Sequence, residues 1–175
     1  MSIRDVIVVL NRMEADGVVD RYAIGGAVGA TFWLEPVSTL DVDVFVAFHP
    51  EPGAVLVTPK PILDYLTARG CAMQGEYVMI ADWPVQFLPP TSALVEEALR
   101  EAVEADVDGA PARVFRAEHL AAIALQTGRA KDKARLLQFL EEGAVDDALF
   151  HEIIRRHALV DAWATFERQF LSDTP

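Results

Sequence analysis

The chain has 175 residues, 52% of them hydrophobic, and a formal net charge of −12. This length suits one domain, or one domain with a small helical addition, and the apolar content excludes a disordered chain. The negative charge excludes strong unaided binding to nucleic acid or to an anionic membrane. A polyanionic substrate would therefore need a local basic patch or metal ions.

The cysteine content and the first residues indicate a compartment. Cys71 is the single cysteine, which excludes an internal disulfide and fits a reducing cytoplasm. The first 17 residues carry charges within a short apolar run, so they do not resemble a signal peptide or a membrane span. We therefore expect a soluble protein of a bacterial-type cytoplasm, with no membrane partner.

The first third of the chain alternates between helical and strand patterns. Apolar residues at helical spacing predict an amphipathic helix from residue 3 to Gly17. A short strand at residues 21–24 runs into the turn Gly25-Gly26, and residues 27–34 form a short helix that cannot continue past Pro36. Residues 40–48 first alternate and then become wholly apolar, which predicts a strand inside a sheet covered on both faces.

The rest of the chain predicts a second set of elements. They are a helix at 61–70, a hairpin at 75–90, a helix at 91–106, a turn at 106–109 and a strand at 113–116. Four helical patterns then follow from Ala117, and their short turns predict a C-terminal helical bundle packed on the sheet. The fold class is α/β or α+β, with residues 1–112 as the sheet domain and residues 113–175 as the helical part.

The pair Asp41 and Asp43 lies in the predicted strand at 40–48. Residues two apart in a strand share one face, with Cα atoms roughly 6.6 Å apart, so the two carboxylates can hold one divalent cation together. Carboxylate oxygens suit Mg²⁺, which completes its shell with water and substrate phosphates. The turn at Gly25-Gly26 opens a helix, where backbone N–H groups can approach a phosphate without a Cβ in the way.

The arrangement of Gly25-Gly26, a short helix, Ser38-Thr39 and Asp41-Val42-Asp43 resembles the signature of nucleotidyltransferases that share the DNA polymerase beta catalytic fold. Together with the later "ALQTGRAKDKARL", it looks like small bacterial nucleotidyltransferase-like proteins related to abortive-infection toxins. The resemblance implies a mixed nucleotidyltransferase-type sheet and transfer of NMP from a nucleoside triphosphate to a hydroxyl of RNA or protein.

The resemblance also implies roles for individual residues. Asp41 and Asp43 would be catalytic and would hold Mg²⁺, while the Gly25-Gly26 turn would bind the phosphates, with Ser38 and Thr39 beside it. An antitoxin is the partner that a toxin-antitoxin pair implies. The basic cluster at residues 129–135 is either a solvated helix face or a contact for triphosphate or RNA, and Lys131 is the residue we assign to nucleotide binding.

One position departs from the family pattern. The third carboxylate of the family, which helps to activate the attacking hydroxyl, matches Gln86 in this chain, and we include Gln86 among the catalytic positions. A neutral amide cannot accept a proton and is a poorer metal ligand. Asp82 and Glu76 are candidate replacements, although Asp82 also fits an ordinary hairpin turn.

Three hypotheses remain open on the sequence. The first is a Mg²⁺-dependent nucleotidyltransferase, and the second is a catalytically degenerate binding or regulatory module of the same fold, which Gln86 favours. The third is a structural domain in which Asp41 and Asp43 are solvated at a sheet end and Gly25-Gly26 only makes a tight turn. The sequence favours an enzyme, without identifying the nucleotide or the acceptor.

Overall fold

A single mixed sheet is the centre of the protein. The computed structural model describes residues 2–35, 39, 41–48 and 58–172. Within these residues the sheet has seven strands in the order β3-β4-β5-β2-β1-β7-β6. They are β1 (Arg21–Ile24), β2 (Val42–Ala47), β3 (Ala72–Gln74), β4 (Tyr77–Ile80), β5 (Trp83–Leu88), β6 (Val103–Val107) and β7 (Ala110–Val114).

The sheet combines parallel and antiparallel strand pairs. Strand β2 runs parallel to β5 and antiparallel to β1, which is itself parallel to β7. The strands β3, β4 and β5 form an antiparallel meander, and β6 and β7 form a hairpin at the opposite edge. The expected mixed sheet is therefore confirmed.

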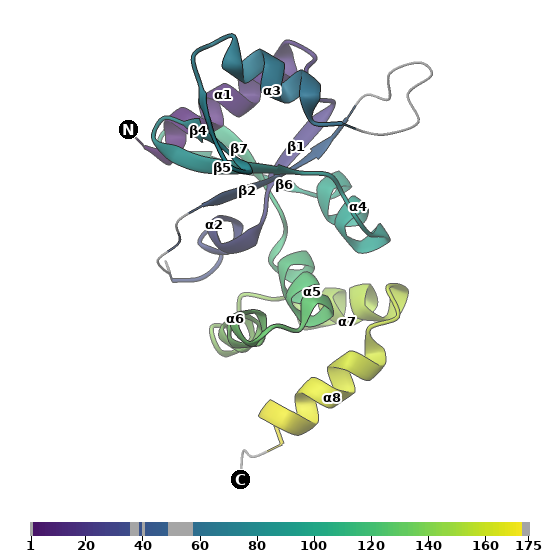
Figure 1. Ribbon diagram of the computed structural model, residues 1–175. Coiled ribbons are helices and arrows are strands. Elements are labelled where there is room, and N and C mark those ends of the chain that lie inside the picture. The colour runs from purple at the N-terminus through teal and green to yellow at the C-terminus, as the bar shows by residue number, and fades with distance from the viewer. Residues whose placement is uncertain (1, 36–38, 40, 49–57, 173–175) are drawn as a thin grey trace.

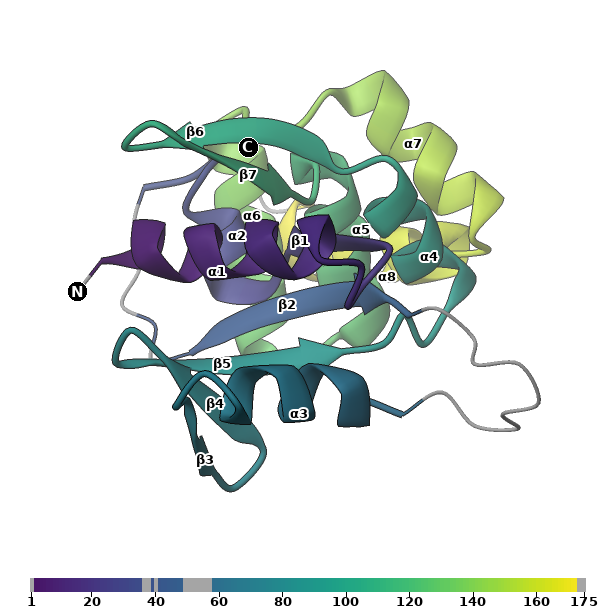
Figure 2. The ribbon, with the colours of Figure 1, turned by 90° about the horizontal axis from the view of Figure 1, so that it is seen from above.

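Helices cover both faces of the sheet (Figures 1 and 2). They are α1 (Ile3–Ala15), α2 (Gly26–Ala30), α3 (Lys60–Thr67), α4 (Ala93–Arg100), α5 (Ala117–Thr127), α6 (Ala130–Glu141), α7 (Asp147–Arg156) and α8 (Val160–Phe170). Helices α1 and α3 lie on one face, and α2 and α4 lie on the other, where the C-terminal helices α5 to α8 follow them. No helix among the described residues has both the length and the apolar character that crossing a membrane requires.

Alternation along β2 divides its side chains between two cores. Val42, Val44 and Val46 are fully buried in a cluster with residues of α1 and α3. Their neighbours Asp43 and Phe45 are half-buried on the opposite face, where Phe45 packs against the other cluster. The valines therefore fix the register of β2, because a slip of one residue would bury Asp43 in the first core.

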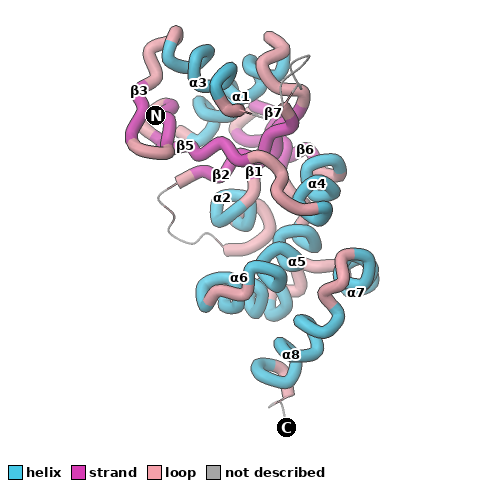
Figure 3. Tube along the Cα trace, turned by 45° about the vertical axis from the view of Figure 1, so that its right-hand side comes forward, coloured by secondary structure: helices cyan, strands magenta, loops and turns pink. Residues whose placement is uncertain are grey.

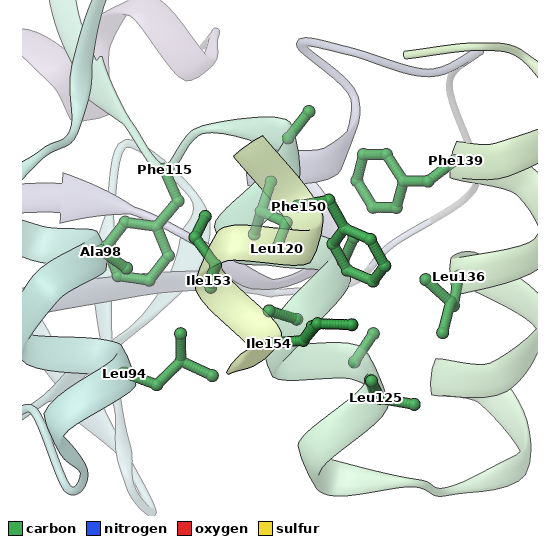
Figure 4. Close-up of a cluster of buried hydrophobic side chains, with 14 of the residues drawn as sticks. Leu94, Ala98, Phe115, Leu120, Leu125, Leu136, Phe139, Phe150, Ile153 and Ile154 are labelled. Atoms are coloured by element: carbon green, nitrogen blue, oxygen red, sulfur yellow. The ribbon is translucent and has the colours of Figure 1, made fainter. Parts of the chain in front are cut away.

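The second core joins the sheet to the C-terminal helices (Figure 4). Leu94 and Ala98 of α4 lie in the same cluster as Phe115, while Phe139 of α6 and Phe150 of α7 enter it from the other side. Figure 3 shows the C-terminal helices gathered together beyond α2 and α4, away from the strands. The expected C-terminal helical bundle is confirmed.

The helix expected at 91–106 is wrong in its second half. Helix α4 ends at Arg100, and residues 103–107 form β6 instead. Valine or alanine alternates with acidic residues there, which is a strand pattern, and Asp108 and Gly109 both have positive φ in the two-residue turn to β7. The turn at 106–109 was expected, but the strand before it and the edge strand β3 were not.

Candidate functional site

Strand β2 presents both aspartates to one side of the sheet. Asp41 immediately precedes β2, and Asp43 lies within it, on the face opposite the buried valines. In the parallel pair of β2 with β5, Asp43 lies directly beside Gln86. Asp41, Asp43 and Gln86 all line one pocket, so the three expected catalytic positions lie together.

The Gly25-Gly26 turn packs directly against Asp43. The Gly25 N–H donates a hydrogen bond to the Asp43 carbonyl oxygen at 3.0 Å. Gly26 has a φ of +57°, and a Cβ on it would lie 2.0 Å from Asp43 Oδ2. Glycine is therefore required for two reasons, the left-handed backbone and the close approach of the carboxylate.

The pocket has a volume of about 920 Å³ and lies between the sheet face and the helices α5 and α6. Of the expected nucleotide-binding residues, Gly26, Thr39 and Lys131 line it, whereas Gly25 is not among the described lining residues. A Cβ on Gly25 would lie 2.6 Å from the Phe45 ring and 3.1 Å from the Phe115 ring. Ser38 lies outside the described residues. This volume is typical of a site for a small molecule.

Opposite charges face one another across the pocket. Arg129, Lys131 and Arg135 come from the start of α6 and line the pocket together with the two aspartates. Arg129 is ion-paired with the buried Asp132, Nε to Oδ2 at 2.6 Å, and this bond raises the pKa of Arg129. We therefore expect Lys131 and Arg135, rather than Arg129, to contact a bound ligand.

Burial and mutual repulsion disturb the aspartate pair. The pKa of Asp43 is raised, first by burial and second by the negative charge of Asp41. The charges of Lys131, Arg135 and Arg129 act in the opposite direction but do not reverse the shift. A divalent cation between the two carboxylates would remove this repulsion, and two carboxylate ligands are what Mg²⁺ usually takes from a protein. The donor set therefore fits Mg²⁺.

Two hydroxyl groups flank the other aspartate. Thr39 Oγ1 lies 3.4 Å from Asp41 Oδ1, and the Tyr77 hydroxyl lies 3.5 Å from Asp41 Oδ2. Both distances are long for an O–H···O bond. Tyr77 is a pocket residue that the sequence prediction missed, whereas Arg135 belongs to the basic cluster that the sequence left open as a ligand contact. The sequence showed Tyr77 only as a strand residue, because the strand pairing that brings it to the aspartates is not local.

The two candidate replacements for the third carboxylate lie elsewhere. Asp82 is exposed in the turn between β4 and β5, with a φ of +65°, and is not among the described residues that line the pocket. Glu76 is exposed in the turn between β3 and β4 and is also outside the described lining of the pocket. Gln86 is therefore the polar side chain beside Asp43 on β5.

A second polar cluster lies between α4, α5 and the end of α7. Glu97 is 5% exposed and accepts two hydrogen bonds from the Arg156 guanidinium, at 2.6 and 3.1 Å. His157 Nε2 and His119 Nε2 lie 2.7 and 3.1 Å from the same carboxylate. These contacts, led by the Arg156 hydrogen bonds, lower the pKa of Glu97 to about 2.

Glu97, His119 and the nearby Glu101 also have ligand atoms within 4.8 Å of one another, so this group could hold a metal ion. However, Arg156 already supplies the positive charge that the Glu97 carboxylate needs. A cation here would be repelled by the guanidinium. We therefore treat the Glu97 cluster (Glu97, His119, Arg156 and His157) as a structural contact between helices.

Known proteins resemble this chain in structure only. No model of a known protein family matches the sequence, and no curated protein matches it. A crystal structure of an antigenic nucleotidyltransferase-like protein from Paracoccidioides brasiliensis matches at a TM-score of 0.63 and 13% identity, over 95% of this chain and 88% of the other. The chain therefore has a nucleotidyltransferase fold, as the sequence predicted.

Two structures of the antibiotic-resistance factor ANT(2'')-Ia are more distant. Its solution structure matches at a TM-score of 0.46 and 16% identity, over 93% of this chain and 95% of the other. Its crystal structure in complex with adenylyl-2''-tobramycin matches at a TM-score of 0.44 and 14% identity, over 94% and 98%. The narrower resemblance to toxin-related proteins stays a prediction.

Proposed function

We propose that this protein binds a nucleoside triphosphate with Mg²⁺ and transfers its NMP group to a hydroxyl of RNA or protein. The observation that carries the proposal is the pocket itself, in which Asp41 and Asp43 face the basic residues Lys131 and Arg135. Elements far apart in the sequence supply these opposite charges. A nucleotidyltransferase fold around the pocket supports the same reaction class.

The aspartates are the proposed metal ligands. When bound, Mg²⁺ would neutralise charge on the phosphates and so assist in-line attack of the acceptor hydroxyl on the α-phosphorus, with pyrophosphate as the leaving group. Asp43 is held in place by the Gly25 N–H on its carbonyl and by the close packing of Gly26 against its carboxylate. Asp41 is placed by the same strand and by Thr39. Both carboxylates are thereby oriented before any ligand arrives, which reduces the cost of binding.

The start of α6 is the proposed contact for the triphosphate. Lys131 and Arg135 are four residues apart and therefore lie on one side of this helix. Their charges reach Asp43 strongly enough to act on its pKa. They can hold phosphate oxygens on the side away from the metal, and the positive end of the helix dipole adds to their attraction.

A degenerate binding or regulatory module is the second candidate function. Gln86 favours it, because the side chain beside Asp43 on β5 is an amide that cannot take up the proton of an attacking hydroxyl. Such a module would bind the nucleotide without transferring it. As part of the same proposal, the protein would act in a bacterial cytoplasm with an antitoxin as its partner. Residues 1–112 would form its nucleotidyltransferase-like domain, and residues 113–175 its helical part.

The first experiment measures thermal stability with each of the four nucleoside triphosphates, with and without Mg²⁺. A ligand at about one hundred times its dissociation constant stabilises by roughly 2.7 kcal/mol. Wild type should show a Mg²⁺-dependent rise in melting temperature with at least one nucleotide, and the double variant Asp41→Ala/Asp43→Ala should lose it. No rise with any nucleotide would contradict the proposal.

A second experiment distinguishes an active enzyme from a module that binds the nucleotide without transferring it. Wild type and Gln86→Asp are incubated with Mg²⁺ and the α-labelled form of the nucleotide that binds, together with total bacterial RNA or protein. Label transfer by wild type supports the enzyme. Binding without transfer, with transfer gained in Gln86→Asp, supports the degenerate module.

A further inference from the structure

Tyr77 lies in the proposed metal site without having a role in the function proposed above. It begins β4, is half-buried and lines the same pocket as the aspartates. Its hydroxyl lies 3.5 Å from Asp41 Oδ2, on the side opposite the Thr39 hydroxyl, which lies 3.4 Å from Oδ1. Among the described residues, a hydroxyl therefore lies near each oxygen of the Asp41 carboxylate, and the two hydroxyls come from separate segments.

The register of the sheet explains how Tyr77 reaches the aspartates. Val78 pairs with Val85, so the next position along the antiparallel pair places Tyr77 beside Gln86. Gln86 in turn pairs with Asp43 across the parallel strands β5 and β2. Residues opposite one another in adjacent strands share a face. Tyr77, Gln86 and Asp43 thus form one row across three strands. Asp41 precedes Asp43 by two residues and therefore lies on the same side of the sheet.

We propose that Tyr77 is a positioning residue that orients the Asp41 carboxylate for the divalent cation. This inference rests on the proposed function, because it assumes that Asp41 is a metal ligand. A small rotation of the tyrosine from 3.5 Å would bring its hydroxyl within donating distance of Oδ2, where it would oppose rotation of the carboxylate. The second lone pair of Oδ2 would remain for a cation. Loss of such an outer partner typically costs about 10- to 100-fold in metal affinity.

The chain contains a matched control for this hydroxyl. The Tyr65 hydroxyl donates to Asp16 Oδ2 at 2.6 Å, a shorter tyrosine–aspartate contact on the surface between α1 and α3. Neither Tyr65 nor Asp16 lines the pocket. The variants Tyr77→Phe and Tyr65→Phe remove the same atom and the same kind of partner, and they differ in whether the aspartate is a proposed metal ligand.

The test measures binding of Mn²⁺, which shares the preference of Mg²⁺ for carboxylate oxygens and whose free form is quantified by electron paramagnetic resonance. Wild type, Tyr77→Phe, Tyr65→Phe and Asp41→Ala are titrated with Mn²⁺, alone and with the nucleotide that stabilises wild type most. Melting temperatures without metal are recorded for each variant. The Mn²⁺ dissociation constant should rise about 10- to 100-fold in Tyr77→Phe and stay unchanged in Tyr65→Phe.

The possible results distinguish a failure of the role of Tyr77 from a failure of the proposed metal site. If wild type binds Mn²⁺, Asp41→Ala does not and Tyr77→Phe matches wild type, the role of Tyr77 is overturned and the metal site stands. If wild type binds no Mn²⁺ with or without nucleotide, the metal site and the role of Tyr77 are overturned together. An unchanged melting temperature in Tyr77→Phe shows that weaker Mn²⁺ binding does not come from unfolding.

Discussion

Two acidic sites of this protein, the buried Glu97 and the half-buried pair Asp41 and Asp43, are built in opposite ways. In the Glu97 cluster, one carboxylate meets a guanidinium and two imidazoles, and its pKa falls to about 2. In the pocket, Asp41 and Asp43 repel one another, and the pKa of Asp43 rises. The first site completes its electrostatics with the protein's own residues, whereas the second gains by adding a cation. This difference is expected between a site for stability and a site for a ligand.

The largest predicted effect is the loss of the Glu97 carboxylate. Glu97→Ala leaves His119 and His157, whose side chains are 0% and 10% exposed, without their shared partner, and each buried polar group left unsatisfied costs about 1–3 kcal/mol of unfolding free energy. Asp16→Ala is the control, because Asp16 also pairs with arginine but is 41% exposed, and exposed pairs contribute less than about 1 kcal/mol. Denaturant unfolding measures both. Similar losses in the two variants would contradict the structural role of the Glu97 cluster.

The pH dependence of stability is a second test of the ion pair at Glu97. The pKa of Glu97 is about 2 when folded and 4.5 when unperturbed, so its contribution is complete above about pH 4.5 and is lost as the pH falls toward 2. Wild type should therefore lose more unfolding free energy across this interval than Glu97→Gln, which has no carboxylate to protonate. Parallel pH curves for the two proteins would show that the ion pair is not formed in solution.

The Gly25-Gly26 turn gives the next largest effect. Gly26→Ala strains the left-handed backbone and places a Cβ where the Asp43 carboxylate lies, so we expect a loss of about 2 kcal/mol or more together with loss of Mg²⁺-dependent nucleotide binding. Gly17→Ala is the matched control. Gly17 has a φ of +72° with no atom within 4 Å of the added Cβ, so it should lose about 1 kcal/mol and leave binding intact.

Chemical unfolding and nucleotide titration of both glycine variants provide the check. Equal losses of stability, or nucleotide binding by Gly26→Ala at the affinity of wild type, would mean that contact with Asp43 does not constrain the turn.

Loss of a basic residue that lines the pocket gives the smallest of these effects. Lys131→Ala should weaken nucleotide binding about tenfold, because a hydrogen bond to a charged group contributes about 1.5–3 kcal/mol. Lys133→Ala is the control on the same helix, since the Lys133 ammonium lies 5.7 Å from the centre of the Phe170 ring and outside the described lining of the pocket. Calorimetric titration of the two variants measures the difference. Equal affinities would exclude a phosphate contact at Lys131.

Local periodicity predicted the part of the site that lies on one strand. Asp41 and Asp43 are two residues apart in an alternating segment, and the valines between and after them had to face a core, so their common face was visible in the sequence. The helical bundle and the mixed sheet followed from patterns of the same kind. The resemblance to the family placed Gln86 beside the aspartates, and it pairs with Asp43, although its role stays a prediction.

Long-range contacts explain what the sequence did not reveal. Tyr77 reaches Asp41 only through the pairing of β4, β5 and β2. Arg135, which the sequence left open as either a solvated residue or a ligand contact, reaches the pocket because α6 returns toward the sheet. Strand β6 was predicted as helix because Ala102, Val103 and Ala105 also continue the helical pattern of α4. The pair Asp108-Gly109 is typical of a two-residue hairpin turn, so the segments on both sides of it could have been predicted as paired strands.

The central claim is that the pocket holds the aspartates for a cation, at a cost to the metal-free protein. A raised folded-state pKa means that the charged form of Asp43 lowers stability as the pH rises above the ordinary carboxylate range. The most direct measurement is the melting temperature of Asp43→Asn at neutral pH, without and with Mg²⁺ and nucleotide. We predict a higher value than wild type without metal and loss of the Mg²⁺-dependent rise. A lower value without metal, together with a retained rise, would contradict the account.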